Sequence, residues 1–175
     1  MKRPVKIFNK SNNDLPNYMT ELSAGFDIRA DLSRVTDMTD LVGSSAKFAF
    51  TFPEMGHKSV TLFPKGGRVL IPTGLHVAIP EGYEIQIRPR SGLALKHGIT
   101  VLNSPGTIDN DFLGEIGLIM INTDPSNDFE ITDGDRIAQG ILCRVEQIEW
   151  EKVDTIDKLG NTVRGQGGFN STGKN

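Results

Sequence analysis

Apolar and polar residues alternate with a period of two along much of this chain. Residues 83–88 read Tyr-Glu-Ile-Gln-Ile-Arg, which is typical of a strand with one buried face. Residues 145–150 alternate in the same way, and residues 68–79 are rich in β-branched side chains. Residues 118–121 form a continuous apolar run, the pattern of a strand covered on both faces. The sequence therefore predicts an all-β fold built from many short strands.

Turn residues and helix signals agree with that fold class. Glycine, proline and aspartate interrupt the strands at short intervals, which favours a sandwich or barrel. Two segments could form a turn or two of helix, 91–96 and 34–41, with Ser91 or Ser33 as the N-cap. Residues 154–162 are expected to be a tether that leads to a glycine-rich tail.

The composition is that of one ordinary globular domain. Of the 175 residues, 37% are hydrophobic and 23% are charged. The net charge of −3 provides no basic field, so direct binding to a nucleic-acid backbone is not expected. No apolar run approaches the ~20 residues of a membrane span, and the N-terminus lacks a hydrophobic signal core. We therefore expect a cytoplasmic protein with no membrane partner.

The cysteine and histidine patterns do not suggest a metal centre. Cys143 is the lone cysteine, and it lies in an apolar, strand-like run, so we expect a small buried side chain in a reducing compartment. The positions of His57, His76 and His97 do not have the spacing of metal ligands. Structural or surface roles are expected for all three histidines.

Asp109 lies in a turn-rich segment, 105–115, just ahead of the apolar run that begins near Ile116. A carboxylate displayed at a turn can act as a general base toward water, an effect worth roughly 10²–10⁴ in rate. The same residue could instead form an Asx-turn, in which its side chain only ties down the backbone. The segment alone does not separate the two interpretations.

Two further polar groups could hold a phosphorylated ligand. Arg90, Ser91 and Gly92 precede the candidate helix, where a hydroxyl and backbone N–H groups favour an anion, although Ser91 could equally be a simple N-cap. Ser91 is not expected to be a nucleophile, because the sequence assigns no base to it. Asp27 and Arg29 would share one face of a strand, either as a surface ion pair or with Asp27 orienting water on a phosphate-held magnesium ion.

The C-terminal stretch, 164–173, combines one fixed cation, four glycines, an aromatic ring and two hydroxyls. It suits a flap that closes on a phosphorylated, planar ligand, since Arg164 could grip phosphate oxygens and Phe169 could stack on a base. Taken alone, the segment could equally be a disordered tail. The motifs upstream favour the flap.

Five segments resemble, in order, the five motifs of the trimeric dUTP diphosphatases: 24–30, 89–99, 106–116, 134–139 and 164–173. The resemblance spans nearly the whole chain. It implies a jelly-roll-like β-barrel or sandwich subunit, a homotrimer with shared active sites, and Mg²⁺-dependent hydrolysis of dUTP to dUMP and pyrophosphate. Such an activity would limit uracil incorporation into DNA and supply dUMP for dTTP synthesis. Residues 1–160 would form the β domain and residues 161–175 a flexible glycine-rich flap.

The resemblance also implies catalytic roles. Asp109 would activate the water that attacks the α-phosphorus, and Gln139 would help to position that water. Asp27 would orient water on Mg²⁺ without being a direct ligand, while Arg136 would support structure. Closure of the flap would exclude bulk water and bring Arg164 to the developing charge.

Substrate recognition is implied for a larger set of residues. A β-hairpin from Asn103 to Gly117 would hold uracil, and Phe112, where the family commonly has tyrosine, would pack on the deoxyribose and exclude a 2′-hydroxyl. The implied binding set is Arg90, Ser91, Gly92, Asn103, Gly106, Thr107, Ile108, Asp109, Phe112, Gly117, Gln139, Arg164, Phe169, Asn170, Ser171 and Thr172.

Two features depart from the family pattern. Asn170 stands where the motif usually has glycine, so a backbone contact to phosphate is altered. The stretch 33–64 is longer than the usual connection and is interpreted as an insertion. It contains residues 48–52, whose alternation predicts an added strand or hairpin with a buried aromatic face. A local extension of the sheet is the favoured hypothesis, and a surface for an unidentified partner is the alternative.

Two other functions stay open at this point. A dCTP deaminase shares a related fold and two motifs, but it needs a glutamate where this chain has Ile119, and it lacks the tail pattern. A non-catalytic regulator could use the same trimer and pocket as a binding switch. The presence of Asp109, Arg164 and Phe169 argues against an inactive pocket.

Overall fold

The computed structural model describes residues 2–37, 40–41, 48–52 and 56–167. Within these residues the secondary structure is almost entirely β, so the predicted fold class is confirmed. The elements are β1 (Lys6–Asn9), β2 (Phe26–Arg29), β3 (Phe48–Thr51), β4 (Ser59–Leu62), β5 (Gly67–Pro72), β6 (Leu75–Ala78), β7 (Tyr83–Pro89), α1 (Ser91–His97), β8 (Ile99–Val101), β9 (Gly106–Ile108), β10 (Gly117–Asn122), β11 (Phe129–Thr132), β12 (Arg136–Arg144) and the 3-10 helix η2 (Ile156–Leu159).

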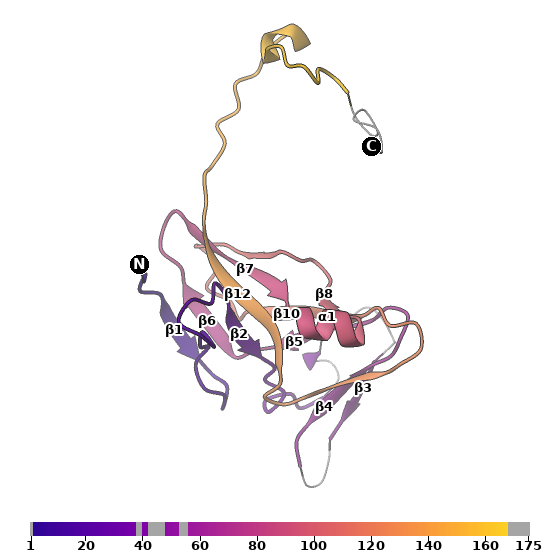
Figure 1. The fold of residues 1–175 in the computed structure, drawn as a ribbon. Coiled ribbons are helices and arrows are strands. Elements are labelled where there is room, and N and C mark those ends of the chain that lie inside the picture. Colours follow the sequence, from indigo (N-terminus) through magenta and orange to yellow (C-terminus); the bar gives the residue numbers. More distant parts are fainter. Residues whose placement is uncertain (1, 38–39, 42–47, 53–55, 168–175) are drawn as a thin grey trace. The chain divides into compact units, whose positions relative to one another are not determined.

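The strands pair antiparallel in four small sheets. Their orders are β1-β6, β5-β10-β8, β11-β4-β3 and β2-β12-β7-β9. The long strand β12 runs beside β7 in Figure 1 and also pairs with β2. Because β12 has both strands as neighbours, it brings the segment around Asp27 next to the end of β7, which leads into α1.

The core lies where the inward faces of the strands meet. Strands β5, β7 and β10 each bury every second side chain, because successive residues of a strand point to opposite faces. The buried hydrophobic residues of these three strands are Val69, Ile71, Ile85, Ile87, Leu118 and Met120, and none is more than 3% exposed. Burial of each such side chain contributes about 1.5–3 kcal/mol. The alternation predicted for residues 83–88 is therefore confirmed.

Two expected strands differ from the structure. In β10, Ile119 and Ile121 are only half-buried, so within this chain one face of the strand is covered rather than two. Residues 145–150 alternate in sequence but form no strand. Strand β12 ends at Arg144, and the last backbone bond there joins the Val145 N–H to the carbonyl of Gly82 over 3.0 Å. After Val145, no neighbouring strand in the described chain offers backbone groups with which residues 146–150 could pair.

The two helix predictions have different outcomes. The segment 91–96 is helical and forms most of α1. The helix is capped at its C-terminus by Gly98, whose left-handed φ of 64° favours glycine. The segment 34–41 is not an α-helix in the part of it that the structure describes, where Ser33 and Arg34 form a turn. The amide groups of Leu32 and Ser33 there bond to the Asp133 carboxylate rather than continuing into a helical turn.

The predicted strand at 48–52 is present as β3, which pairs with β4 and extends the sheet of β11. Phe48 and Phe50 pack against the core, and Phe50 lies 4.3 Å from Phe52, ring centre to ring centre. Phe52 itself is 47% exposed, so the aromatic face is buried only in part. The Lys58 ammonium bonds the carbonyl of Ser33 over 2.8 Å. These contacts support local packing as the role of this segment.

The chain divides into two compact units, 1–145 and 146–175. The second unit contains η2, and Lys158 in this helix pairs with Asp154, which precedes it, over 2.7 Å. The expected tether at 154–162 thus includes a short 3-10 turn. The predicted start of the flap at residue 161 stays a prediction. None of the helices in the described residues is long and apolar enough to cross a membrane.

Candidate active site

Strand β7 leads directly into α1, and the predicted phosphate-contacting residues lie at this junction. Arg90 occupies the N-cap position with extended backbone (φ −84°, ψ 125°), and Ser91 is the first residue of the helix. Arg90 makes no side-chain cap hydrogen bond, and since Ser91 is not at the cap position, the prediction of Ser91 as the N-cap is wrong. Ser91 and Gly92 are instead exposed and accessible to a ligand.

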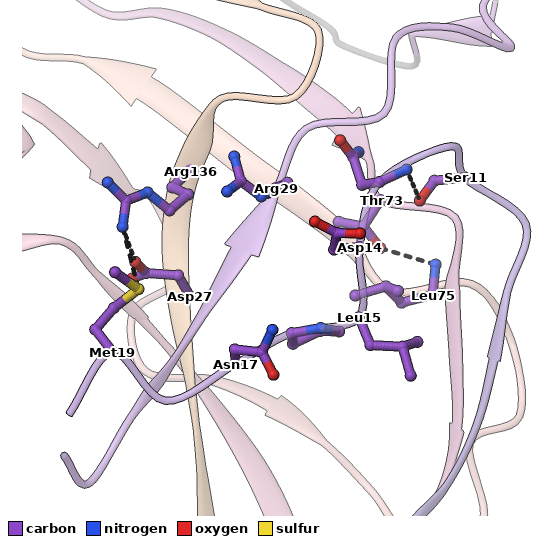
Figure 2. Close-up of a pocket in the computed structure, with 12 residues that line it drawn as sticks. Ser11, Asp14, Leu15, Asn17, Met19, Asp27, Arg29, Thr73, Leu75 and Arg136 are labelled. Carbon is purple, nitrogen blue, oxygen red and sulfur yellow. Dashed lines mark hydrogen bonds and ion pairs between the residues drawn. The ribbon is translucent and has the colours of Figure 1, made fainter. Parts of the chain in front are cut away.

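The Asp27 carboxylate joins three segments of the chain. Its Oδ2 lies 3.0 Å from Nη1 of Arg136, and its Oδ1 lies 3.4 Å from Nε of Arg90. Arg90 also donates to the Arg136 carbonyl over 2.8 Å. Figure 2 shows the contact between Asp27 and Arg136. Arg29 instead donates to the Gly134 carbonyl over 2.6 Å, so the expected Asp27–Arg29 ion pair is not formed.

Gln139 lies on β12 beside the same cluster. The strand register places it opposite Asp27 of β2 and Arg88 of β7, and its Nε2 donates to the Pro89 carbonyl over 2.9 Å. Its Oε1 faces Gly25, where an added Cβ would come within 2.6 Å of that oxygen. A side chain at position 25 would displace the Gln139 amide, which explains the glycine. Gln139 is therefore held next to the start of α1.

A small pocket borders this cluster. It has a volume of about 100 Å³, and its walls include Asp27, Arg29, Asn17, Thr73 and Arg136 (Figure 2). Pockets that hold a nucleotide-sized ligand are several times larger, about 300–1,000 Å³. The pocket alone could take a few waters or a small ion, and its lining does not include Asp109.

Asp109 begins an exposed loop directly after β9. Its backbone carbonyl accepts a hydrogen bond from the Phe112 N–H over 3.2 Å, which closes a turn. Its carboxylate makes no hydrogen bond or ion pair with the residues that the structure describes, so the Asx-turn interpretation is not supported. The Phe112 ring folds over Gly114, where a Cβ would lie 2.6 Å from Cζ, and the side chain remains 42% exposed. Both the carboxylate and the ring are open to a ligand.

The expected β-hairpin around residues 103–117 is present in the pair β8-β10, whose strands are antiparallel and are connected by the segment that begins at Asn103 and leads to Gly117. Strand β9 pairs with β7, whereas β10 pairs with β5 and β8. Gly106 is buried at the start of β9, and a Cβ there would come 3.2 Å from Nδ2 of Asn103. Thr107 is exposed and Ile108 half-buried. The connection from β8 to β10 therefore starts and ends on one sheet, while β9 within it pairs with a strand of another sheet.

The register of β9 on β7 separates two parts of the predicted site. Ile108 is opposite Ile85, so Asp109 comes level with Glu84 near the beginning of β7, while Ser91 follows the end of that strand. About six residues of strand lie between these positions, or roughly 20 Å at ~3.3 Å per residue. Within one chain the structure therefore does not bring Asp109 and Ser91 together.

The far end of the Asp109 loop is tied down by residues that the sequence did not indicate. The Leu113 carbonyl lies 2.9 Å from Nδ1 of His76, and Oε1 of Glu115 accepts a bond from the Gly74 N–H over 2.9 Å. The same Glu115 oxygen lies 2.7 Å from Nη2 of Arg34. The partners are too distant in sequence for any local pattern to connect them.

Arg34 in turn holds a carboxylate that is almost completely buried. Its Nε donates to Asp31 over 2.6 Å, and the Asp31 side chain is 1% exposed. Partial burial works against the Arg34 charge, but the hydrogen bonds to Asp31 and Glu115 outweigh it and raise the pKa of Arg34. The guanidinium therefore stays charged between two acids.

Comparison with known proteins identifies the family. The family model for dUTPase matches residues 55–173, more than half of the chain. The chain belongs to the dUTPase family. A deoxyuridine 5′-triphosphate nucleotidohydrolase of Fusobacterium nucleatum is 43% identical over 174 residues, which is 99% of both chains. One of Finegoldia magna is 46% identical over 169 residues, covering 97% of this chain and 98% of the relative.

Solved dUTPase structures share the fold. The dUTPase of Staphylococcus bacteriophage 80alpha with dUPNHPP superposes with a TM-score of 0.69 at 20% identity, covering 98% of this chain and 99% of that one. A mutant dUTPase from phage phi11 of S. aureus, described with a structural Mg(II) ion, has a TM-score of 0.62 at 18% identity over 89% of this chain and 99% of that one. At these identities the likeness concerns the fold.

The fifth dUTPase motif is described only at its beginning. Arg164 is exposed and donates from Nε to the Gly167 carbonyl over 2.8 Å, within the second compact unit. The other predicted flap residues, Phe169, Asn170, Ser171 and Thr172, lie outside the described residues. The contribution of the flap to the site therefore stays a prediction.

The described residues offer no protein-built metal cage in this dUTPase-family chain, since no group of three or more histidine, cysteine, aspartate or glutamate side chains is placed to hold an ion. Asp27 was predicted to contact magnesium through a water molecule, and its carboxylate forms ion pairs with Arg90 and Arg136. A carboxylate has about four acceptor positions, so Asp27 can still accept hydrogen bonds from metal-bound water. The donor set fits an ion that is carried by phosphates and not one that is caged by protein.

Proposed function

We propose that this chain hydrolyses dUTP to dUMP and pyrophosphate, because its relatives are named deoxyuridine 5′-triphosphate nucleotidohydrolases. In the cytoplasm this activity would limit uracil incorporation into DNA and supply dUMP. The observation that carries the proposal is the Asp109 carboxylate, which is exposed and unpaired among the described residues at the position matching the third family motif. An ionised, accessible carboxylate can accept the proton of a water molecule as that water attacks the α-phosphorus. A structural carboxylate would be tied to donors, as Asp27 and Asp31 are.

The remaining roles follow from position and chemistry. Ser91 and Gly92 present a hydroxyl and backbone N–H groups to the phosphates. Arg90 keeps 30% of its side chain exposed while Asp27 holds its Nε, so it can contact a phosphate and remain oriented. Gln139, fixed at the junction of β7 and α1, would position the catalytic water.

Base and sugar would be recognised beside β9. The Asn103 amide lies next to the buried Gly106, where backbone groups can approach the edge of uracil closely. The Phe112 ring, folded over Gly114, offers an apolar face to deoxyribose. An added 2′-hydroxyl would meet that face without a hydrogen-bond partner, which disfavours ribose.

We infer that the complete site is shared between subunits of a homotrimer. The strand register separates Asp109 from Ser91 by about the length of β7, a distance that one dUTP molecule cannot bridge within one chain. In a closed ring, Asp109 of one subunit would face Ser91 of its neighbour, and the flap from Arg164 to Thr172 would close over both. The half-buried Ile119 and Ile121 supply apolar surface for such an assembly.

Magnesium belongs to the proposal as a phosphate-bound ion. Asp27 would hold a water of the ion from outside its first coordination shell. Such an ion neutralises charge on the phosphates and orients them for attack. The residues of this chain would supply the base, the phosphate contacts and the exclusion of bulk water.

A product assay tests the hydrolase function. Wild type, Asp109→Asn and Asp111→Asn are incubated with dUTP, dCTP, dTTP or UTP and Mg²⁺, and nucleotides, pyrophosphate and ammonia are measured. Asp111 is the matched control, because it is an exposed carboxylate on the same loop. We expect dUMP and pyrophosphate from dUTP alone, a loss of about 10²–10⁴-fold in Asp109→Asn, and nearly full activity in Asp111→Asn.

Other outcomes identify the alternatives. Ammonia from dCTP would assign the chain to the deaminases. Binding of dUTP by wild type and Asp109→Asn alike, without turnover by either, would favour a non-catalytic regulator. Equal losses in the Asp109 and Asp111 variants would contradict a specific role for Asp109 as the base.

Mixed oligomers test the shared site. Asp109→Asn and Ser91→Ala subunits are co-expressed with different tags, and the doubly tagged assembly is purified. A doubly tagged trimer contains both kinds of subunit, so one of its three interfaces combines an intact Asp109 with an intact Ser91, and activity should recover to about a third of wild type. Activity no higher than the average of the two variants would contradict a site built by two subunits.

A further inference from the structure

We propose that His76 is a positioning residue for the reaction, because it holds the loop that carries Asp109 and Phe112. The inference rests on the proposed hydrolysis of dUTP. It assigns a role in catalysis to a histidine outside the five motif segments, on a strand at the edge of the β1-β6 sheet.

In the hydrogen bond between His76 and the loop, only the histidine can be the donor. Nδ1 of His76 lies 2.9 Å from the Leu113 carbonyl oxygen, which can only accept, so Nδ1 carries the proton and donates. The other ring nitrogen, Nε2, is buried and has no hydrogen-bond partner among the described residues. The Phe8 ring packs at 5.8 Å from the imidazole, centre to centre. The orientation of the ring is thus set by the Leu113 bond and by packing.

The loop needs such a support because little else fixes it. Residues 109–113 are all exposed, so their side chains contribute few packing contacts. The hydrogen bond from the Phe112 N–H to the Asp109 carbonyl makes residues 109–112 one turn. Leu113 follows this turn directly, so holding its carbonyl also limits movement of the Asp109 carboxylate and the Phe112 ring.

A second contact reaches the same part of the scaffold. Glu115 accepts a hydrogen bond from the Gly74 N–H, two residues before His76, and is held by Arg34. The far end of the loop is therefore tied to Gly74, between β5 and β6, and to His76 on β6, and the Ile116 N–H donates to the Leu75 carbonyl over 2.8 Å. Because Glu115 remains when His76 is changed, loss of the histidine should leave the fold intact and affect the turn beyond it.

The expected effect is on turnover more than on binding. A displacement of about 1 Å of a catalytic group can cost about 10²-fold in rate, whereas most substrate contacts, at the phosphates and the flap, do not involve this loop. We expect kcat to fall about tenfold or more, KM to change little, and the preference for dUTP over UTP to decrease because Phe112 moves with Asp109.

Two substitutions at His76 separate positioning from packing. His76→Phe keeps an aromatic ring against Phe8 and removes the donor. His76→Asn removes the ring, but its side-chain amide nitrogen can take the place of Nδ1 and donate to Leu113. His97→Phe is the control, because His97 packs 5.0 Å from Phe129, centre to centre, and within the described residues it makes no hydrogen bond to the Asp109 loop.

The experiment measures kcat and KM for dUTP and UTP, together with thermal stability, for wild type and the three variants. We expect His76→Phe to be as stable as wild type and at least tenfold slower, and His76→Asn to be less stable and within about threefold of wild-type kcat. His97→Phe should keep wild-type kcat. If His76 acts by positioning the loop, His76→Asn is thus the less stable but the more active of the two His76 variants.

Activities that follow stability across the variants, or a wild-type kcat in His76→Phe, would overturn the inference. A wild type that does not turn over dUTP would instead reject the proposed function. The two failures are therefore distinguishable in one experiment.

Discussion

Replacing Asp27 with asparagine should weaken the contact between β2, β12 and the start of α1. Asparagine has nearly the same shape, but it lacks the negative charge that Arg90 and Arg136 share. Its Oδ1 can still accept one hydrogen bond, whereas its NH₂ group would face a guanidinium that has no acceptor. Two cations would then lie close together without the anion between them.

The size of the effect follows from partial burial. A hydrogen bond to a charged group contributes about 1.5–3 kcal/mol, and a fully exposed ion pair about 0–1 kcal/mol. The Asp27 side chain is 17% exposed, and those of Arg136 and Arg90 are 35% and 30% exposed. We therefore expect the free energy of unfolding to fall by about 1–2 kcal/mol. A similar loss in holding Arg90 beside Ser91 during reaction would lower kcat/KM about tenfold.

Urea unfolding and dUTP turnover, measured at one protein concentration because oligomer stability depends on it, test this prediction. Asp14→Asn is the matched control, since Asp14 lines the same pocket, is exposed, and makes no ion pair with the described residues. The control should stay within about 0.5 kcal/mol of wild type. Unchanged stability of Asp27→Asn, or equal losses in both variants, would refute the reasoning.

Two further predictions concern packing and acid stability. In Gly140→Ala the new Cβ would lie 2.4 Å from Cζ of Phe26, so the ring must move, and thermal unfolding should show a loss of about 1–3 kcal/mol; an unchanged melting temperature would contradict this. Backbone N–H groups of Ser126 and Asn127 lower the pKa of Asp124. The stability that Asp124 contributes is thus present above its unfolded pKa of about 4 and lost as pH falls through the lower folded value, so Asp124→Asn should flatten the pH dependence of stability below about pH 4. Parallel acid-unfolding curves for the two proteins would argue against it.

Local pattern predicted individual strands well where a partner was present. The alternation at 83–88 identified β7, because side chains of a strand point alternately to the two faces whatever surrounds them. The same alternation at 145–150 predicted a strand that the structure lacks. A strand exists only where a neighbouring backbone takes up its hydrogen bonds, and a pattern within one segment does not specify that neighbour.

Motif order identified candidate residues but not their contacts. The sequence indicated Asp27 and Asp109 as two carboxylates with candidate chemical roles, and it left open an ion pair between Asp27 and the nearby Arg29. In the structure Asp27 is neutralised by Arg136, 109 residues away, while Asp109 is exposed and unpaired among the described residues. This difference is the reason for proposing Asp109, and not Asp27, as the base.

The sequence by itself determined the fold class, the helix after β7 and, through five ordered motifs, the family and the candidate site residues. Only the tertiary structure decided that Asp109 and Ser91 lie at opposite ends of β7 and that His76 supports the Asp109 loop. The physical reason is the range of the forces involved. Periodicity and turn preference act between near neighbours in the chain, whereas ion pairs and loop supports depend on which distant strands become adjacent and in which register.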